Sequence, residues 1–150
     1  MESREKPSWG IRIFAPLFFI SGAIAALLWF FYRISNIFIG TLSEIVVFDK
    51  GSFYMLGVGV GMLILSVVTV QEGWLDKPLS KIQSAYLTKG AFIGIALIFT
   101  VPHLVHYFAN GYLLKQGYTV CEEASHQWLF VRDIVYIADS IECNASLKMK

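Results

Sequence analysis

Charged residues are scarce in this chain. They make up 15% of its 150 residues, against about 25% in an average soluble domain. Hydrophobic residues make up 56%. This balance excludes an ordinary soluble domain and predicts a membrane protein. The formal net charge of +1 and the lack of a Lys/Arg cluster also exclude nucleic acid as a partner.

Catalytic motifs are missing as well. The sequence has three histidines and two cysteines, and it shows no Ser-His-Asp set, no paired acids and no phosphate-binding loop. The glycines of LGVGVGM lie inside an apolar run without a strand, a lysine or an acidic partner, so they do not form a nucleotide loop. A metal site would need more ligands than the histidines supply. We therefore expect no enzyme, no metal and no cofactor.

Three apolar runs contain no Asp, Glu, Lys or Arg. A bilayer core of about 30 Å is crossed by roughly 20 helical residues, and each run is that long. Backbone groups in lipid must bond within their own segment, so the runs are predicted to be helices. The first run is too long for a cleavable signal peptide, and we interpret it as a retained helix. The predicted spans are 13–32 (IFAPLFFISGAIAALLWFFY), 51–71 (GSFYMLGVGVGMLILSVVTVQ) and 90–109 (GAFIGIALIFTVPHLVHYFA).

Basic residues beside the spans predict the orientation. The N-terminus and the second loop carry six of them: Arg4, Lys6, Arg12, Lys77, Lys81 and Lys89. The other side carries three close to the membrane: Arg33, Lys50 and Lys115. The positive-inside rule then places residues 1–12 in the cytoplasm. The transmembrane domain covers 13–110, and the tail, 111–150, lies outside.

Both cysteines, Cys121 and Cys143, fall in this tail. An oxidising compartment would let them form a disulfide, with two free thiols as the alternative. The stretch QWLFVRDIVYIAD is too short and too charged for a fourth span, and its β-branched and aromatic residues predict a strand or two. The predicted fold is an all-α membrane protein with three transmembrane helices. A small extracytoplasmic C-terminal cap follows them and has room for short strands.

The first outer loop, RISNIFIGTLSEIVVFDK, has apolar residues at helical spacing. This pattern predicts a short amphipathic helix along the membrane interface. A loop folded against the tail is the alternative.

Glycines four apart occur in two of the spans. Gly57 and Gly61 form one such pair and Gly90 and Gly94 the other. This spacing places both glycines on one helix face and allows another backbone to approach closely. We expect packing between helices of the same chain, with a homo-oligomer as the alternative.

Two histidines are the only ionisable groups that the spans contain besides tyrosines. His103 and His106 are three residues apart and share a helix face just after Pro102. The helix is predicted to end near Asn110-Gly111. An ionisable residue inside a membrane span is by default a functional hypothesis. We predict a partner-binding set that consists of His103, His106, Tyr107 and Tyr112; the alternative is that the histidines are hydrogen-bonded packing groups.

The tail opens with GYTVC, in which Gly117, Tyr118 and Cys121 follow the third span. This layout resembles small enterobacterial membrane proteins of an uncharacterised three-span family with a Gly-Tyr-x-x-Cys tail, many of which are similar to immunity proteins. The resemblance implies a protein of the bacterial inner membrane that binds a membrane-targeting toxin or secreted effector and so protects the producing cell. An accessory or regulatory subunit of a larger membrane complex is the alternative, followed by a small channel or transporter.

Overall fold

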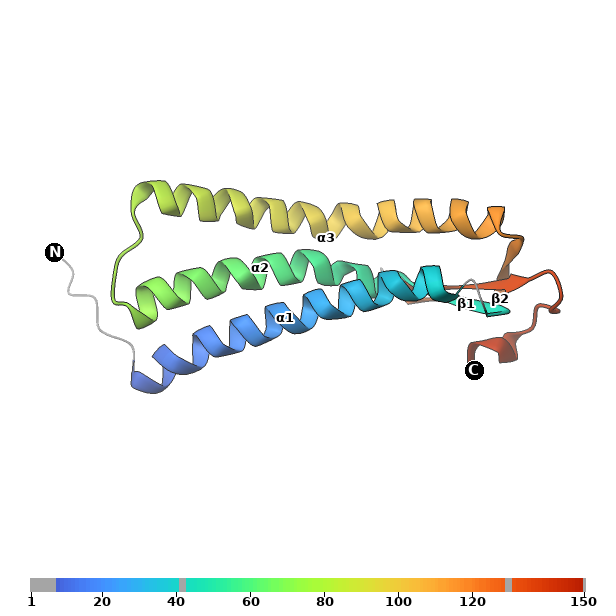
Figure 1. Ribbon diagram of the computed structural model, residues 1–150, viewed down its shortest axis with the longest axis horizontal. Helices are drawn as coiled ribbons and strands as arrows, with labels where there is room; N and C mark the ends of the chain where they lie inside the picture. The colour runs from blue at the N-terminus through green and yellow to red at the C-terminus, as the bar shows by residue number, and fades with distance from the viewer. Residues whose placement is uncertain (1–7, 41–42, 129–130, 150) are drawn as a thin grey trace.

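The computed structural model describes residues 8–40, 43–128 and 131–149. Three long helices run side by side, with α2 between α1 and α3, and a small sheet lies at one end (Figure 1). The elements are α1 (Trp9–Gly40), β1 (Ile45–Asp49), the 3-10 helix η1 (Lys50–Tyr54), α2 (Met55–Val68), the π-helical η2 (Thr69–Trp74), α3 (Lys81–Lys115), β2 (Tyr118–Trp128), β3 (Val131–Ala138) and the 3-10 helix η3 (Ala145–Met149).

Three helical segments are long and apolar enough to cross a membrane: Trp9–Ile39, Lys50–Trp74 and Lys81–Lys115. They contain the three predicted spans, so the prediction of three long apolar helices is confirmed. Most of their side chains face outward, with only about a fifth of each apolar window buried inside the protein. Because large apolar side chains cover the outer faces, this architecture fits a multi-pass membrane protein.

Two helices extend farther than the spans. α1 continues to Gly40, so the separate interfacial helix predicted after Tyr32 does not exist. The physical reason is that residues 33–39, RISNIFI, contain no glycine or proline that would end the helix after Tyr32. α3 continues through Gly111 to Lys115, and the predicted end near Asn110 is therefore wrong. The positive φ of 86° that ends this helix falls on Gly117, where a residue without Cβ tolerates it.

The sheet joins two parts of the chain that are distant in sequence. Its strand order is β1-β3-β2 and both pairings are antiparallel. Val135 of β3 lies opposite Val47 on one side and opposite Cys121 on the other. The strands expected in the tail are present. The first outer loop supplies the third strand, β1. The loop is therefore folded against the tail, which is the alternative to the interfacial helix.

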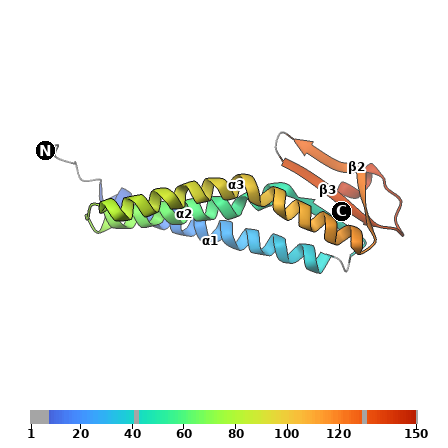
Figure 2. The same ribbon diagram turned by 90° about the horizontal axis from the view of Figure 1, so that it is seen from above.

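The main hydrophobic core lies where the sheet meets the helices. β1 contributes Phe48, β3 contributes Tyr136, and α3 contributes Leu113, all of which are buried. Phe53 of η1 stacks on Phe48 with ring centroids 5.0 Å apart. This core attaches the sheet to the side of the bundle end, as the view from above shows (Figure 2).

A second, smaller core covers the other face of the sheet. Val135 and Ile137 of β3 pack there against Ile141 and Leu147 of the C-terminal segment. Cys121 of β2 is buried in the same cluster and forms a disulfide with Cys143, with Cα atoms 5.4 Å apart. The predicted disulfide is therefore present. Because both faces of β3 are buried, its sequence contains a continuous apolar run, IVYI, and apolar and polar residues do not alternate there.

Candidate functional site

The junction of helices and sheet is organised around one carboxylate, that of Asp49. Asp49 ends β1, and its Oδ1 accepts hydrogen bonds from the backbone N–H of Gly51 at 2.8 Å and of Ser52 at 3.4 Å. Its Oδ2 accepts one from the Ser52 hydroxyl. An aspartate in this N-cap position satisfies the amides that a helix start leaves without partners. This local geometry turns the chain from the sheet into α2.

Two side chains of α1 connect to this turn. The Arg33 guanidinium lies 3.6 Å from Asp49 Oδ2, and the two side chains are 24% and 29% exposed. The Trp29 indole donates a hydrogen bond to Ser52 Oγ at 3.0 Å. The α1 helix therefore holds the turn through one ion pair and one neutral hydrogen bond.

The two predicted histidines approach the same turn from α3, but they have different surroundings. His103 is exposed, and its Nδ1 lies 3.2 Å from Lys50 Nζ. An ammonium group only donates, so Nδ1 acts as the acceptor in this contact. His106 is half-buried, with its ring 5.5 Å from that of Phe48. The structure thus places His103 on the surface and His106 in the packing beneath the sheet.

The two tyrosines of the predicted set are also separated. Tyr107 is 74% exposed on α3. Tyr112 is half-buried and lies against Phe38 of α1, with ring centroids 5.6 Å apart. Among the four predicted residues, therefore, His103 and Tyr107 are open to a partner, whereas His106 and Tyr112 pack within the protein.

Hydrogen bonds hold the sheet against the helix ends. The fully buried Tyr136 hydroxyl donates to Asn110 Oδ1 of α3 at 3.0 Å, and the Tyr118 hydroxyl donates to the Ser43 carbonyl at 2.6 Å. Burial raises the pKa of Tyr136 to about 12, although the nearby Arg132 lowers it slightly. Tyr136 is therefore a neutral hydrogen-bond donor at physiological pH.

A groove of about 460 Å³ runs between the end of α1 and β1. Among the described residues β1 pairs only with β3, so it is an edge strand. The groove has apolar walls and a polar end where Arg33 and Asp49 meet. Its lining comes from α1 (Arg33, Asn36, Ile37, Ile39), the following turn (Ser43), β1 (Ile45, Val46, Val47, Phe48, Asp49) and η1 (Phe53).

The predicted packing glycines lie between α2 and α3. A Cβ on Gly57 would come within 2.6 Å of the Gly94 carbonyl oxygen, so the two helices approach each other closely at these glycines. A Cβ on Gly90 would lie 3.1 Å from Ile64 Cδ1 of α2. A Cβ on Gly61 would meet nothing within 4 Å.

Sequence reasoning did not identify the residues that build the junction. Asp49, Ser52 and Trp29 were not predicted, and Arg33 and Lys50 entered only as topology signals. One signal was available: Asp-x-Gly-Ser at residues 49–52 is a pattern in which aspartate caps a turn. The link between Tyr136 and Asn110 depends on the tertiary fold and has no local signal.

No group of three or more His, Cys, Asp or Glu side chains gathers to hold a metal ion in the part of the chain that the structure describes. A scan of protein-family models gives no match to the chain, and searches of curated proteins and of solved structures likewise give none. The resemblance based on Gly117, Tyr118 and Cys121 stays a prediction.

Proposed function

We propose that this chain is an immunity protein of the bacterial inner membrane, which binds a membrane-targeting toxin or secreted effector by protein contact. The N-terminus is cytoplasmic and the sheet lies on the periplasmic side. The observation that carries the proposal is the surface of α3 beside the sheet. There, exposed His103 and Tyr107 stand where the apolar span ends and the cap begins.

Such a surface suits a toxin that inserts from outside. Imidazole and phenol groups can hydrogen-bond an incoming helix at a depth where water competes weakly. The neighbouring residues Leu104 and Phe108 are 55% and 68% exposed and offer apolar contacts to the same helix. The histidine and tyrosine thus supply recognition, and the apolar neighbours supply contact area.

The cap gives this surface a fixed frame. The turn around Asp49, the contact of Lys50 with His103 and the hydrogen bond from Tyr136 to Asn110 connect sheet and helices at three points. A preorganised surface binds more tightly because less conformational entropy is lost on association. The edge of β1 and its groove extend the recognition surface to an added strand or loop of the toxin.

A protection assay tests the proposal. Cells that express the chain are challenged with the toxin encoded beside its gene, and survival is counted. We expect His103→Ala with Tyr107→Ala to reduce survival at least tenfold at unchanged protein level. His126→Ala, which removes an exposed histidine from β2, is the matched control and should protect fully. Full protection by the double variant would show that these two residues do not contribute to toxin recognition.

A tail exchange tests the cap separately. Replacing 111–150 by the tail of an unrelated three-span protein should abolish protection if the cap helps to form the surface.

Failure of the native chain to neutralise any neighbouring toxin would instead favour the alternative, an accessory subunit of a membrane complex. The open face of Gly61 is the feature that suits this alternative, since another helix could approach α2 there.

A further inference from the structure

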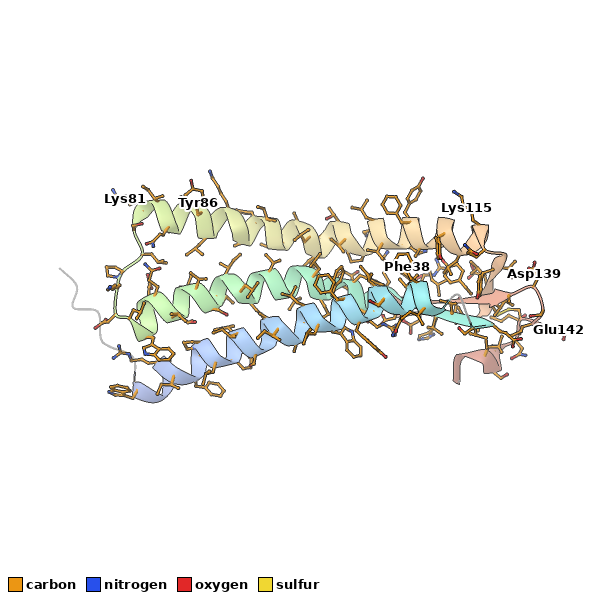
Figure 3. All side chains as sticks on the ribbon, in the orientation of Figure 1. Phe38, Lys81, Tyr86, Lys115, Asp139 and Glu142 are labelled. Carbon is orange, nitrogen blue, oxygen red and sulfur yellow. A yellow bond between two sulfur atoms is a disulfide. The ribbon has the colours of Figure 1, made fainter. Side chains whose placement is uncertain are left out.

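The end of α3 opposite the sheet carries a second exposed surface. It is a shallow depression of about 320 Å³ lined by Lys81, Ile82, Ala85, Tyr86 and Lys89. These residues recur at spacings of three and four, so they share one helix face. Figure 3 shows Lys81 and Tyr86 at the end of α3 that lies opposite Lys115 and the cap residue Asp139.

Neither lysine of this surface has an acidic partner among the described residues. α3 contains no Asp or Glu along its 35 residues. Within the described residues, no hydrogen bond or ion pair reaches Lys81 Nζ or Lys89 Nζ, and both side chains are exposed. An anion from outside the chain is the natural partner of two lysines placed in this way.

The depression is held in a fixed geometry. Ser80 Oγ accepts a hydrogen bond from the Gln83 N–H at 3.2 Å, and Gln83 Oε1 accepts one from the Ser80 N–H at 3.0 Å, which completes a capping box. Gln71 of η2 donates to the same Gln83 oxygen at 3.0 Å. The first turn of α3 is thereby fixed to the preceding helix.

The surroundings indicate that the anion carries apolar chains. Ile82 and Tyr86 between the lysines are 69% and 70% exposed. Farther along the same helix, Phe92 and Ile93 are 68% and 58% exposed and continue the apolar path into the span. A free phosphate ion would use the lysines and leave this path bare, whereas a phospholipid fills both parts.

The axial positions agree with a lipid headgroup. Lys89 directly precedes the predicted span 90–109, and Lys81 lies about 12 Å farther out at 1.5 Å per residue. The headgroup layer on each side of a bilayer is about 5–8 Å thick. The two lysines therefore bracket this layer, and a tyrosine between them is a typical interfacial residue.

We propose that this surface binds an anionic phospholipid, with Lys81 and Lys89 reaching the phosphate from either side and Tyr86 beside the headgroup. The proposal does not depend on the toxin-binding function. It requires only that α3 spans the bilayer.

Native mass spectrometry of the full chain, purified with an equimolar mixture of phosphatidylglycerol and phosphatidylcholine, tests the proposal. We expect at least threefold more phosphatidylglycerol retained by the native protein. Lys81→Gln with Lys89→Gln should bring the ratio close to one, whereas Lys81→Arg with Lys89→Arg should keep the preference. Lys115→Gln, at the other end of the same helix, is the matched control and should behave as the native protein.

Two results would overturn the proposal. One is an unchanged lipid ratio in the double glutamine variant with native helix content by circular dichroism. The other is complete displacement of the lipid by an equal concentration of soluble glycerol 3-phosphate, which would show that the phosphate alone is the ligand.

Discussion

At the residue scale, Asp49 and Tyr136 connect the sheet to the helices in different ways. Asp49 combines a cap, a hydroxyl contact and an ion pair with Arg33 at a partly exposed position. Tyr136 makes a single hydrogen bond to Asn110 from a fully buried position. The first connection is electrostatic and open to water, whereas the second depends on burial.

The burial of Tyr136 predicts a specific dependence on alkaline pH. Its pKa is raised from 10.0 to about 12 in the folded protein. The unfolded chain loses this proton first, so the stabilisation is complete below pH 10 and is lost as the pH rises toward 12. In a phenolate absorbance titration, the difference between native protein and Tyr136→Phe should show one phenol that titrates near 12. A difference curve centred on 10 would contradict the buried position.

Removal of the Asp49 carboxylate should loosen the turn. Asp49→Ala loses the N-cap, which costs about 0.5–2 kcal/mol of stability, and leaves Arg33 without its partner. We expect faster proteolysis after Lys50 in detergent, with the helices intact. Asp139→Ala, an exposed acid at the far tip of the cap (Figure 3), is the control and should be cleaved as slowly as the native protein.

At the element scale, the close approach of α2 and α3 depends on glycine. A methyl group at Gly57 would lie 2.6 Å from the Gly94 oxygen and 2.7 Å from the Ile98 nitrogen. Both are backbone atoms, so the helices themselves must separate. The same methyl group at Gly61 meets open space.

Gly57→Ala should therefore lower the free energy of unfolding by about 1–3 kcal/mol, as overpacking does elsewhere. Gly61→Ala should be neutral or slightly stabilising because alanine favours a helix over glycine. Unfolding in mixed micelles with increasing dodecyl sulfate, followed by circular dichroism, measures both. Equal destabilisation by the two substitutions would mean that Gly61 also contacts a helix, in this chain or in a second copy.

The long helices were predictable, since runs that lack every charged residue have few other structures available in a bilayer. The end of α1 was not, because Arg33 is tolerated in the helix by its ion pair with Asp49, a contact that only the fold creates. β1 was missed for a similar reason. Ile45–Asp49 is too short to be distinguished from a loop until β3 pairs with it. His103 and Tyr107 are exposed, as a partner-binding role requires, but that role stays a prediction, and the turn beside them was not predicted.

At the scale of the whole molecule, the two ends differ in construction. One end carries the sheet, its two cores and the disulfide. At the other, Arg12 of α1 donates to the carbonyls of Gly73 and Trp74 at 2.6 and 2.9 Å and ties α1 to the end of η2. The orientation that we propose puts the sheet in the periplasm and the end with Arg12 in the cytoplasm.

Reporter fusions test this orientation. Alkaline phosphatase, which is active only in the periplasm, should be active when fused after Lys150 and inactive when fused at Ser80. A cytoplasmic fluorescent reporter should give the opposite pattern. If phosphatase activity appeared at Ser80 and not after Lys150, the sheet would face the cytoplasm and the proposed toxin-binding surface would be inaccessible from outside.

The central position of β3 determines when the cap can form during synthesis. β1 leaves the ribosome early, but its pairing partner, for instance Val135 opposite Val47, follows 88 residues later. β2 also has no neighbour until β3 is present, since β3 separates the two outer strands. β1 therefore stays unpaired while the second and third helices are synthesised, whereas β2, which follows α3, waits only for β3. Chains that stop before residue 131 would lack β3 and with it both pairings of the sheet.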